Sequence, residues 1–285
     1  MKFFCLLSLT AASTIPLHFN PDGVSSFVNM FMGGPAIPFR PFLGSMNVFV
    51  IPSQPVISPE RLIMEGLANL EQSDISMNIP RILNESGNGL IPWIAIGPQS
   101  DLVHQFDSVD FVRGPNGARL ILGSPEERFI AEHCLPNSCL RFQTRSDVDR
   151  VATEAIIMGE RRDIFFDAED FILTMNAYDF NRTFHGSLPT YGRIGVERLL
   201  TLANCEARLA SLPNITISFQ AGHIILTPED YTKRLDGDIC QFLVNFDSYA
   251  NLRERTNVHM NPLLIPNMNM RITNQEILIC ELQDN

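Results

Sequence analysis

The sequence predicts an all-β fold, because hairpin patterns recur at three separate places along the 285 residues. Apolar and polar residues alternate before the turn Gly33-Gly34-Pro35, and a second extended run follows it. Two apolar runs also surround the segment 114–117, and the same arrangement returns around Met158-Gly159. Each pattern indicates two consecutive strands joined by a tight turn, so neighbouring strands in the chain are expected to pair.

Composition and charge place the chain among ordinary globular proteins. Hydrophobic residues make up 45% of it and charged residues 19%, which argues against a disordered chain. The formal net charge of −11 argues against a nucleic-acid partner, which would need a basic surface. Beyond residue 14, no apolar stretch approaches the roughly 18 residues that indicate a membrane helix, so we expect no membrane span.

The first residues resemble a short secretory signal. Lys2 precedes an apolar run from Phe3 to Leu9, and small residues follow at positions 11–13. We expect residues 1–14 to act as this signal and the mature chain to be secreted, either to the extracellular space or into an endomembrane lumen. A buried N-terminal strand is the alternative interpretation.

Secretion would allow disulfides, and five of the six cysteines follow the signal. Cys134 and Cys139 enclose four residues, a spacing that suits a small disulfide-closed loop. Zinc is disfavoured because a second ligand pair is missing, and the histidines show no paired metal spacing. We therefore predict a Cys134–Cys139 disulfide and no metal. Sequons for N-glycosylation stand at Asn84, Asn181 and Asn214.

One helix is predicted over residues 59–71. Ser58-Pro59 suits its start, and apolar residues at positions 63, 67 and 70 recur at helical spacing.

In their order, the motifs resemble those of pepsin-like aspartic peptidases. In that family a strand, a turn and a second strand lead to Asp-Thr-Gly and then to an apolar strand ending in Val-Pro-Ser. Ile51-Pro52-Ser53 resembles that end, and counting back places Leu43-Gly44-Ser45 where the family carries Asp-Thr-Gly. The resemblance therefore implies that Leu43 occupies the position of the first catalytic aspartate.

The second catalytic motif of the family resembles the segment 166–169, Phe-Asp-Ala-Glu, which follows a hairpin. The resemblance aligns Asp167 with the second catalytic aspartate, whereas Ala168 and Glu169 replace the Thr and Gly that follow it. Aspartic peptidases need two carboxylates that share one proton. A chain with Asp167 as the remnant and Leu43 opposite it is therefore expected to lack ordinary peptidase activity.

The resemblance is closest after residue 204. Cys205, then the segments 212–219 and 225–231, and finally Cys240 repeat the family's Cys, Leu-Pro-x-Ile-x-Phe, apolar-Thr/Ser-Pro-x-x-Tyr and Cys. The resemblance thus implies a Cys205–Cys240 disulfide.

The fold that this resemblance implies is the bilobal acid-protease fold, with two β-barrel-like lobes and a cleft between them. Residues 15–124 would form a shortened first lobe with a rebuilt flap region, and residues 125–285 the second lobe. The resulting hypothesis is a secreted, inactive pepsin homologue that binds a peptide or protein. An active aspartic endopeptidase with a non-standard site and a secreted glycoprotein without cleft function stay open. We expect a monomer without a cofactor, and the sequence does not define its binding residues.

Overall fold

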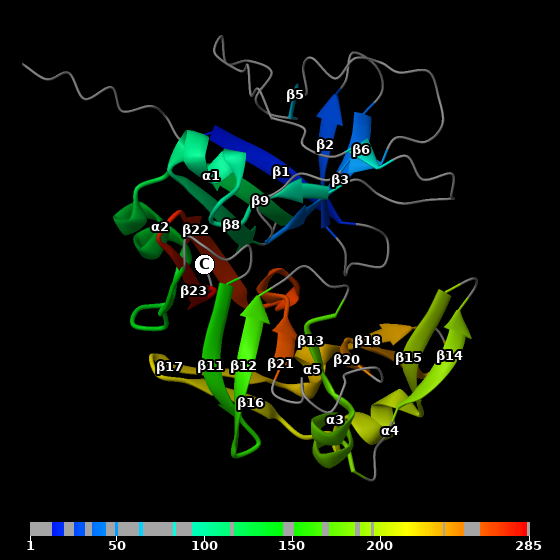
Figure 1. Ribbon diagram of the computed structural model, residues 1–285. Helices are drawn as coiled ribbons and strands as arrows, with labels where there is room; N and C mark the ends of the chain where they lie inside the picture. The colour runs from blue at the N-terminus through cyan, green and yellow to red at the C-terminus, as the bar shows by residue number, and fades with distance from the viewer. Residues whose placement is uncertain are drawn as a thin grey trace, which may run out of the picture.

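The computed structural model describes residues 13–19, 26–31, 36–43, 49–50, 63–64, 82–83, 93–114, 117–144, 151–166, 171–185, 189–194, 197–235, 237–247 and 257–283. These residues are mainly in β-strands (Figure 1). The strands are β1 (Ser13–Phe19), β2 (Ser26–Phe31), β3 (Ala36–Phe42), β4 (Phe49–Val50), β5 (Ile63–Met64), β6 (Ile82–Leu83), β7 (Trp93–Ala95), β8 (Ser108–Gly114), β9 (Gly117–Leu122), β10 (Leu140–Gln143), β11 (Val151–Ile157), β12 (Glu160–Phe166), β13 (Leu173–Asn176), β14 (Thr190–Ile194), β15 (Glu197–Ala203), β16 (Ile215–Phe219), β17 (Gly222–Leu226), β18 (Thr232–Leu235), β19 (Ile239–Phe242), β20 (Val244–Asp247), β21 (Asn257–Met260), β22 (Met268–Thr273) and β23 (Glu276–Glu281). The helices are short: α1 (Asp101–Phe106), α2 (Glu126–His133), α3 (Ala177–Thr183), α4 (Cys205–Leu209), α5 (Pro228–Tyr231) and the 3-10 helix η1 (Pro262–Leu264).

The largest sheet has ten strands and connects distant parts of the chain. Its order is β10-β23-β22-β8-β9-β1-β2-β3-β7, with β5 added to β2. The pairs from β10 to β1 are all antiparallel. The sheet therefore brings the N-terminal strand, the β8–β9 hairpin and the C-terminal hairpin side by side (Figure 1).

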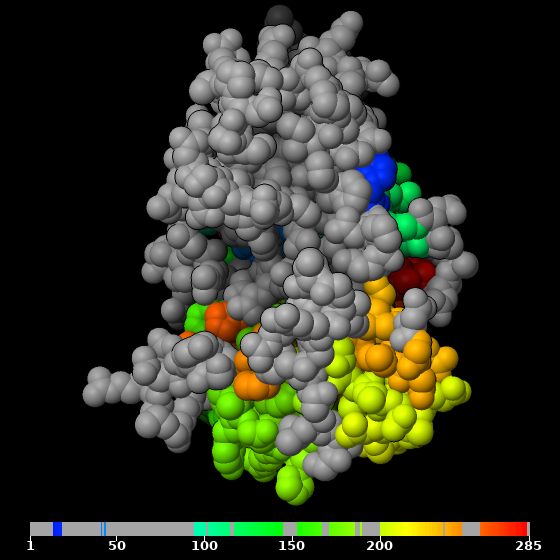
Figure 2. Space-filling model, turned by 90° about the vertical axis from the view of Figure 1, so that its right-hand side faces the viewer, coloured from blue at the N-terminus to red at the C-terminus, as the bar shows by residue number. Residues whose placement is uncertain are grey.

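The second half of the chain builds a seven-stranded sheet in the order β17-β16-β11-β12-β21-β13-β20, and a four-stranded sheet in the order β14-β15-β19-β18. β4 and β6 form a two-stranded sheet of their own. In the seven-stranded sheet β21 lies between β12 and β13, parallel to the first and antiparallel to the second. On the face shown in Figure 2, the coloured surface belongs mainly to this second half, in green to orange.

The three predicted hairpins are confirmed as antiparallel pairs. β2 pairs with β3, β8 with β9, and β11 with β12. The turn of the third hairpin consists of Met158 at φ 52° and Gly159 at φ 81°. Two successive left-handed residues are typical of type I′ turns, whose twist matches that of the strands.

The predicted helix over residues 59–71 is wrong where the structure describes it. Ile63 and Met64 form β5, antiparallel to β2, with Ile63 opposite Phe31 and Met64 opposite Met30. Pairing with β2 satisfies strand hydrogen-bonding groups, and this tertiary contact overrides a weak helical preference. The other residues of that prediction lie outside the described ranges.

β1 begins at Ser13, and its residues Ser13 to Leu17 pair with Leu122 to Ala118 of β9. Ile15 and Leu17 are buried in the core. The expected signal of residues 1–14 therefore overlaps this strand at its last two residues, and positions 1–12 lie outside the described ranges. Among the described residues, no helix combines the length and apolar character that crossing a membrane requires.

One large apolar cluster connects the ten-stranded sheet with the seven-stranded sheet. Phe142 of β10 packs edge-on against Phe166 of β12 and Phe219 of β16, with ring centroids 5.0 and 4.9 Å apart. Such aromatic pairs contribute about 0.5–1.5 kcal/mol each beyond the area that they bury. The two sheets therefore share one apolar core.

Candidate functional site

Two parallel strand pairs lie next to the two residues that the resemblance singles out. β3 runs parallel to β7, and its last paired residue is Phe42, directly before Leu43. β12 runs parallel to β21, and its last paired residue is Phe166, directly before Asp167. In the sequence, Leu43 and Asp167 therefore each come directly after the last paired residue of a strand in a parallel pair, and the two strands belong to different sheets.

Leu43 is a core residue. Its exposed fraction is 1%, and it belongs to the same apolar cluster as Ile94 and Ile96, which lie in and just after β7. A buried leucine contributes packing energy and offers no proton donor or acceptor. Asp167, Ala168 and Glu169 lie outside the described residues.

The chain that follows the Asp167 segment is firmly fixed to the seven-stranded sheet. The amide of Ile172 donates to the carbonyl of Leu243 at 2.9 Å, and the amide of Asn261 donates to the carbonyl of Ile172 at 2.9 Å. Ile172 and Leu173 are fully buried. β12 and β13, the strands before and after Asp167, are thus held on opposite sides of β21.

A buried ion pair joins β12 to α3. The Nε and Nη2 groups of Arg162 donate to both carboxylate oxygens of Asp179 at 2.6 and 2.7 Å. Asn176, the N-cap of α3, donates to the same carboxylate at 2.7 Å and accepts from the amide of Asp179 at 2.9 Å. Hydrogen bonding to Asp179 raises the pKa of Arg162. Both carboxylate oxygens of Asp179 accept hydrogen bonds, so Asp179 connects α3 to β12.

A second buried carboxylate, Asp110 of β8, lies inside the ten-stranded sheet with an exposed fraction of 0%. Arg271 of β22 donates to its Oδ1 at 2.7 Å, and the hydroxyl of Ser124 donates to its Oδ2 at 2.5 Å. Burial outweighs the attraction of Arg271 and raises the pKa of Asp110 to about 6. Asp110 is therefore a proton-binding group in mildly acidic solution, and the sequence analysis did not identify it.

Arg113, at the other end of β8, connects this sheet to its surroundings. Its amide donates to Oδ1 of Asn269 at 2.7 Å, and Nδ2 of Asn269 donates to the carbonyl of His133 at 2.6 Å. Its guanidinium lies 5.1 Å from the centre of the Phe111 ring and donates to the carbonyl of Leu263. Burial lowers the pKa of Arg113 to about 10. These contacts fix the end of α2 and η1 to the sheet.

Cys205 and Cys240 form a disulfide, the pairing that the resemblance implies. It joins the first residue of α4 to β19 across 35 residues of sequence.

The predicted Cys134–Cys139 disulfide is wrong in this structure, because Cys139 is bonded to Cys280 of β23 instead. Strand register explains the difference. Leu140 lies opposite Ile279 in the antiparallel pair β10–β23, so the residue before Leu140 and the residue after Ile279 are neighbours. A four-residue gap between two cysteines cannot reveal a neighbour 141 residues away in sequence. Cys134 is a buried free thiol.

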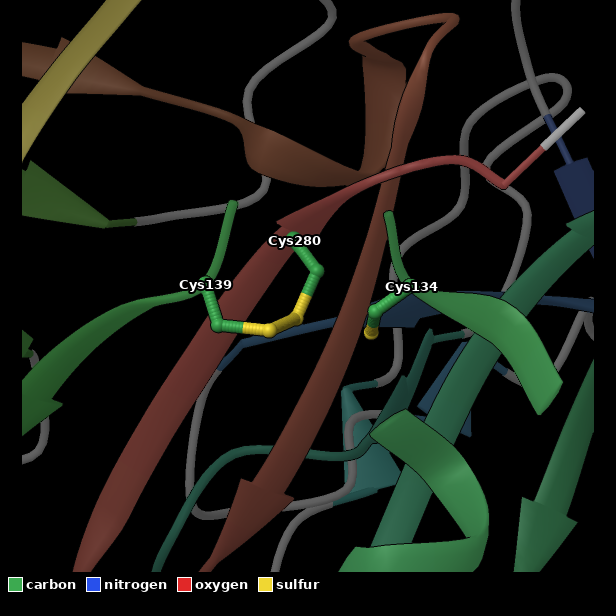
Figure 3. A group of neighbouring side chains, drawn as sticks. All are labelled: Cys134, Cys139 and Cys280. Carbon is green, nitrogen blue, oxygen red and sulfur yellow. A yellow bond between two sulfur atoms is a disulfide. The ribbon is translucent and has the colours of Figure 1, made fainter. Parts of the chain in front are cut away.

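The sulfur atoms of Cys134, Cys139 and Cys280 all lie within 4.8 Å of one another (Figure 3). A structural zinc site takes four ligands. In the part of the chain that the structure describes, no fourth His, Cys, Asp or Glu joins these three sulfurs. The group is therefore better suited to sulfur–sulfur bonding than to zinc.

Two of the three sequons have exposed acceptor residues. Asn181 lies in α3 and Asn214 lies in the segment before β16, and both side chains are exposed. Asn84 lies outside the described ranges. Exposure meets the geometric requirement for glycosylation at Asn181 and Asn214.

No protein-family model and no curated protein matches this chain.

Proposed function

We propose that the chain is a secreted, catalytically inactive relative of pepsin-like aspartic peptidases, which binds a peptide or protein instead of cleaving it. The observation that carries the proposal is the burial of Leu43, the leucine that the resemblance aligns with the first catalytic aspartate. One carboxylate cannot act as the base on water while its partner donates a proton to the substrate carbonyl. The proposed residual group is Asp167 alone.

The paired strand ends support this proposal. β3 with β7 and β12 with β21 are both parallel pairs, and each ends one residue before Leu43 or Asp167. Two strand ends of this kind are what a bilobal protease built on two related halves requires. We infer lobes at residues 15–124 and 125–285 with a cleft between them.

The cysteines support passage through an oxidising compartment. Two disulfides, Cys139–Cys280 and Cys205–Cys240, are present among the described residues. Disulfides persist mainly in secreted or lumenal proteins. This agrees with the proposed secretory signal.

Proteolysis of casein at acid pH tests the loss of catalysis. The wild-type chain and an Asp167→Asn variant are secreted from the same cells, and cleavage is followed with and without pepstatin. We expect no pepstatin-sensitive cleavage by either protein. Cleavage by the wild type that pepstatin blocks and Asp167→Asn abolishes would show an active peptidase and overturn the proposal.

Retention of casein-derived peptides tests the binding role. The wild-type chain is immobilised beside Asp167→Arg and the matched surface variant Glu154→Arg, which makes the same charge change at an exposed position of β11. We expect the wild type and Glu154→Arg to retain the same peptides and Asp167→Arg to retain them at least about tenfold more weakly, a difference of about 1.4 kcal/mol. No retention by the wild type, or equal retention by all three proteins, would argue for a glycoprotein without cleft function.

A further inference from the structure

Three cysteines at three different elements of the fold meet at one edge of the ten-stranded sheet. Cys134 follows α2, Cys139 precedes β10, and Cys280 lies in β23. The disulfide joins Cys139 to Cys280, and Cys134 remains a thiol. Because all three sulfurs lie within 4.8 Å of one another, a free thiol stands next to a disulfide (Figure 3).

Both Cys134 and Cys139 are neighbours of Cys280 on the sheet. Cys139 precedes the β10–β23 pairing, in which Leu140 lies opposite Ile279. Cys134 forms a β-bridge with Leu282, two residues beyond Cys280, and residues two apart in a strand face the same side. Figure 3 shows the Cys134 sulfur beside the Cys280 end of the disulfide.

We propose that the Cys139–Cys280 disulfide exchanges with the thiol of Cys134, so that Cys280 has two alternative partners. The Cys134 thiolate attacks Sγ of Cys280, a Cys134–Cys280 bond forms, and the Cys139–Cys280 bond breaks. Cys139 leaves as a thiolate and takes up the proton that Cys134 released to solvent. One thiol and one disulfide are present before and after the step, so no oxidant or reductant is consumed.

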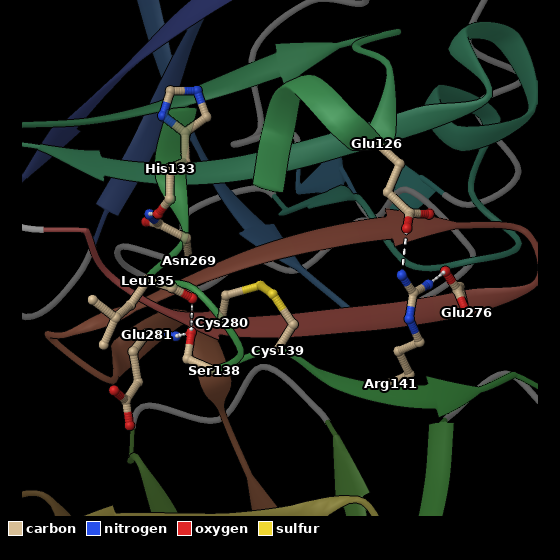
Figure 4. Close-up of a disulfide and its surroundings, with 10 residues drawn as sticks. All are labelled: Glu126, His133, Leu135, Ser138, Cys139, Arg141, Asn269, Glu276, Cys280 and Glu281. Atoms are coloured by element: carbon tan, nitrogen blue, oxygen red, sulfur yellow. Dashed lines mark hydrogen bonds and ion pairs between the residues drawn. A yellow bond between two sulfur atoms is a disulfide. The ribbon is translucent and has the colours of Figure 1, made fainter. Parts of the chain in front are cut away.

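The backbone around the sulfurs is held by contacts that do not depend on the disulfide (Figure 4). The amide of Leu135 donates to the carbonyl of Glu281 at 2.9 Å, and the amide of Glu281 donates to Oγ of Ser138 at 3.1 Å. The hydroxyl of Ser138 donates to the carbonyl of Leu135 at 2.7 Å. Arg141 also binds Glu276 at 2.6 Å. These contacts hold the segments that carry Cys134 and Cys139 against β23, which carries Cys280.

The surroundings of Cys134 make the exchange slow near neutral pH. Its thiol packs among Val112, Ile121 and Phe129, and burial, followed by the nearby charge of Asp110, raises its pKa to about 12. Two other charged groups lie near Cys134. Arg271 is bonded to Asp110, and burial lowers the pKa of the adjacent His133, which disfavours its charged form. The thiolate is the attacking species, and its population rises about tenfold per pH unit below the thiol pKa.

The exchange converts a buried thiol into an accessible one. Cys134 has an exposed fraction of 2%, whereas Cys139 is only partly buried. After exchange, the loop before β10 would carry a free thiol at Cys139, while β23 would stay cross-linked through Cys280. Reactivity toward a soluble alkylating reagent therefore reports the exchange directly.

The test uses the full secreted protein with its disulfides intact. Samples are incubated at about pH 6 and about pH 9 with N-ethylmaleimide, quenched in acid and digested with trypsin, and the labelled peptides are sequenced by tandem mass spectrometry. Trypsin leaves Cys134 and Cys139 together in the peptide that ends at Arg141 and places Cys280 in the peptide after Arg271. Fragment ions between Cys134 and Cys139 then identify the labelled cysteine. Cys134→Ser and Cys139→Ser are prepared as matched variants.

We expect label on Cys139 at the higher pH, with a rate independent of protein concentration and at least about tenfold above that at the lower pH. Cys134→Ser should remain unlabelled, and Cys139→Ser should form the Cys134–Cys280 disulfide during oxidative folding. Label found only on Cys134 or on Cys280, a disulfide-linked dimer of the wild type, or Cys139→Ser without a Cys134–Cys280 bond would each overturn the proposal.

Discussion

The pH dependence of stability is expected to reveal the buried Asp110 in the ten-stranded sheet. Asp110 has an exposed fraction of 0%, and its pKa rises from 3.8 to about 6 because burial outweighs the attraction of Arg271. The folded state therefore binds a proton more tightly than the unfolded state. A shift of about 2 pH units at about 1.36 kcal/mol per unit gives about 3 kcal/mol.

The sign follows from proton binding. Below about pH 3 the carboxyl is protonated in both states, and its full contribution to the free energy of unfolding is present. Between about pH 4 and pH 6 the unfolded state loses the proton first, so the free energy of unfolding falls as the pH rises. Above about pH 6 the loss of about 3 kcal/mol is complete.

Urea unfolding of the wild type and Asp110→Asn across about pH 3 to pH 7 measures this effect, because asparagine has a similar shape and does not ionise. We expect the wild-type free energy of unfolding, minus that of the variant, to fall by about 3 kcal/mol over this range. Ser124→Ala removes a hydrogen bond that favours the ionised carboxyl, so the pKa should rise further and the fall should extend to higher pH and become larger. A difference that stays constant or increases with pH would refute the reasoning and show that Arg271 outweighs burial.

Three further changes test the packing around the proposed site. Leu43→Ala should lower the free energy of unfolding by about 2–5 kcal/mol and Leu43→Met by less than about 1.5 kcal/mol, as measured in urea, and equal small losses would contradict the buried position. The Cys139–Cys280 disulfide spans 141 residues and the Cys205–Cys240 disulfide spans 35. Removing the first should lower the free energy of unfolding by about 1 kcal/mol more than removing the second, because the chain-entropy effect grows with loop length. A smaller loss for the first disulfide would argue against that account. Arg162→Met leaves the Asp179 carboxylate buried without its cation, so we expect a loss of about 3–5 kcal/mol in thermal or urea unfolding, and a change below about 1 kcal/mol would exclude a tight ion pair.

The hairpins were predictable because their signals are local. Alternating apolar residues and a turn such as Met158-Gly159 lie within a few residues of one another, and the structure pairs these strands. The helix predicted over residues 59–71 failed because Ile63 and Met64 pair with β2, a contact that the local periodicity does not contain.

The site was less predictable than the hairpins. Leu43 was located by counting back from Ile51-Pro52-Ser53, but the pairing of Cys139 with Cys280 depends on the register of β10 with β23. Asp110 stands between apolar residues in a strand whose first five residues are all buried. The sequence alone does not show that both faces of β8 are covered, so Asp110 could not be distinguished from a surface acid.

A crystal structure of the secreted protein tests the central claim most directly through one distance, that between the Leu43 side chain and the Asp167 carboxyl. Catalytic carboxylates in aspartic peptidases lie about 3 Å apart. If Leu43 replaces one of them, its methyl groups should lie within contact distance of the Asp167 carboxyl, about 4.5 Å or less. A Leu43 side chain that makes no contact with the loop carrying Asp167 would contradict the account.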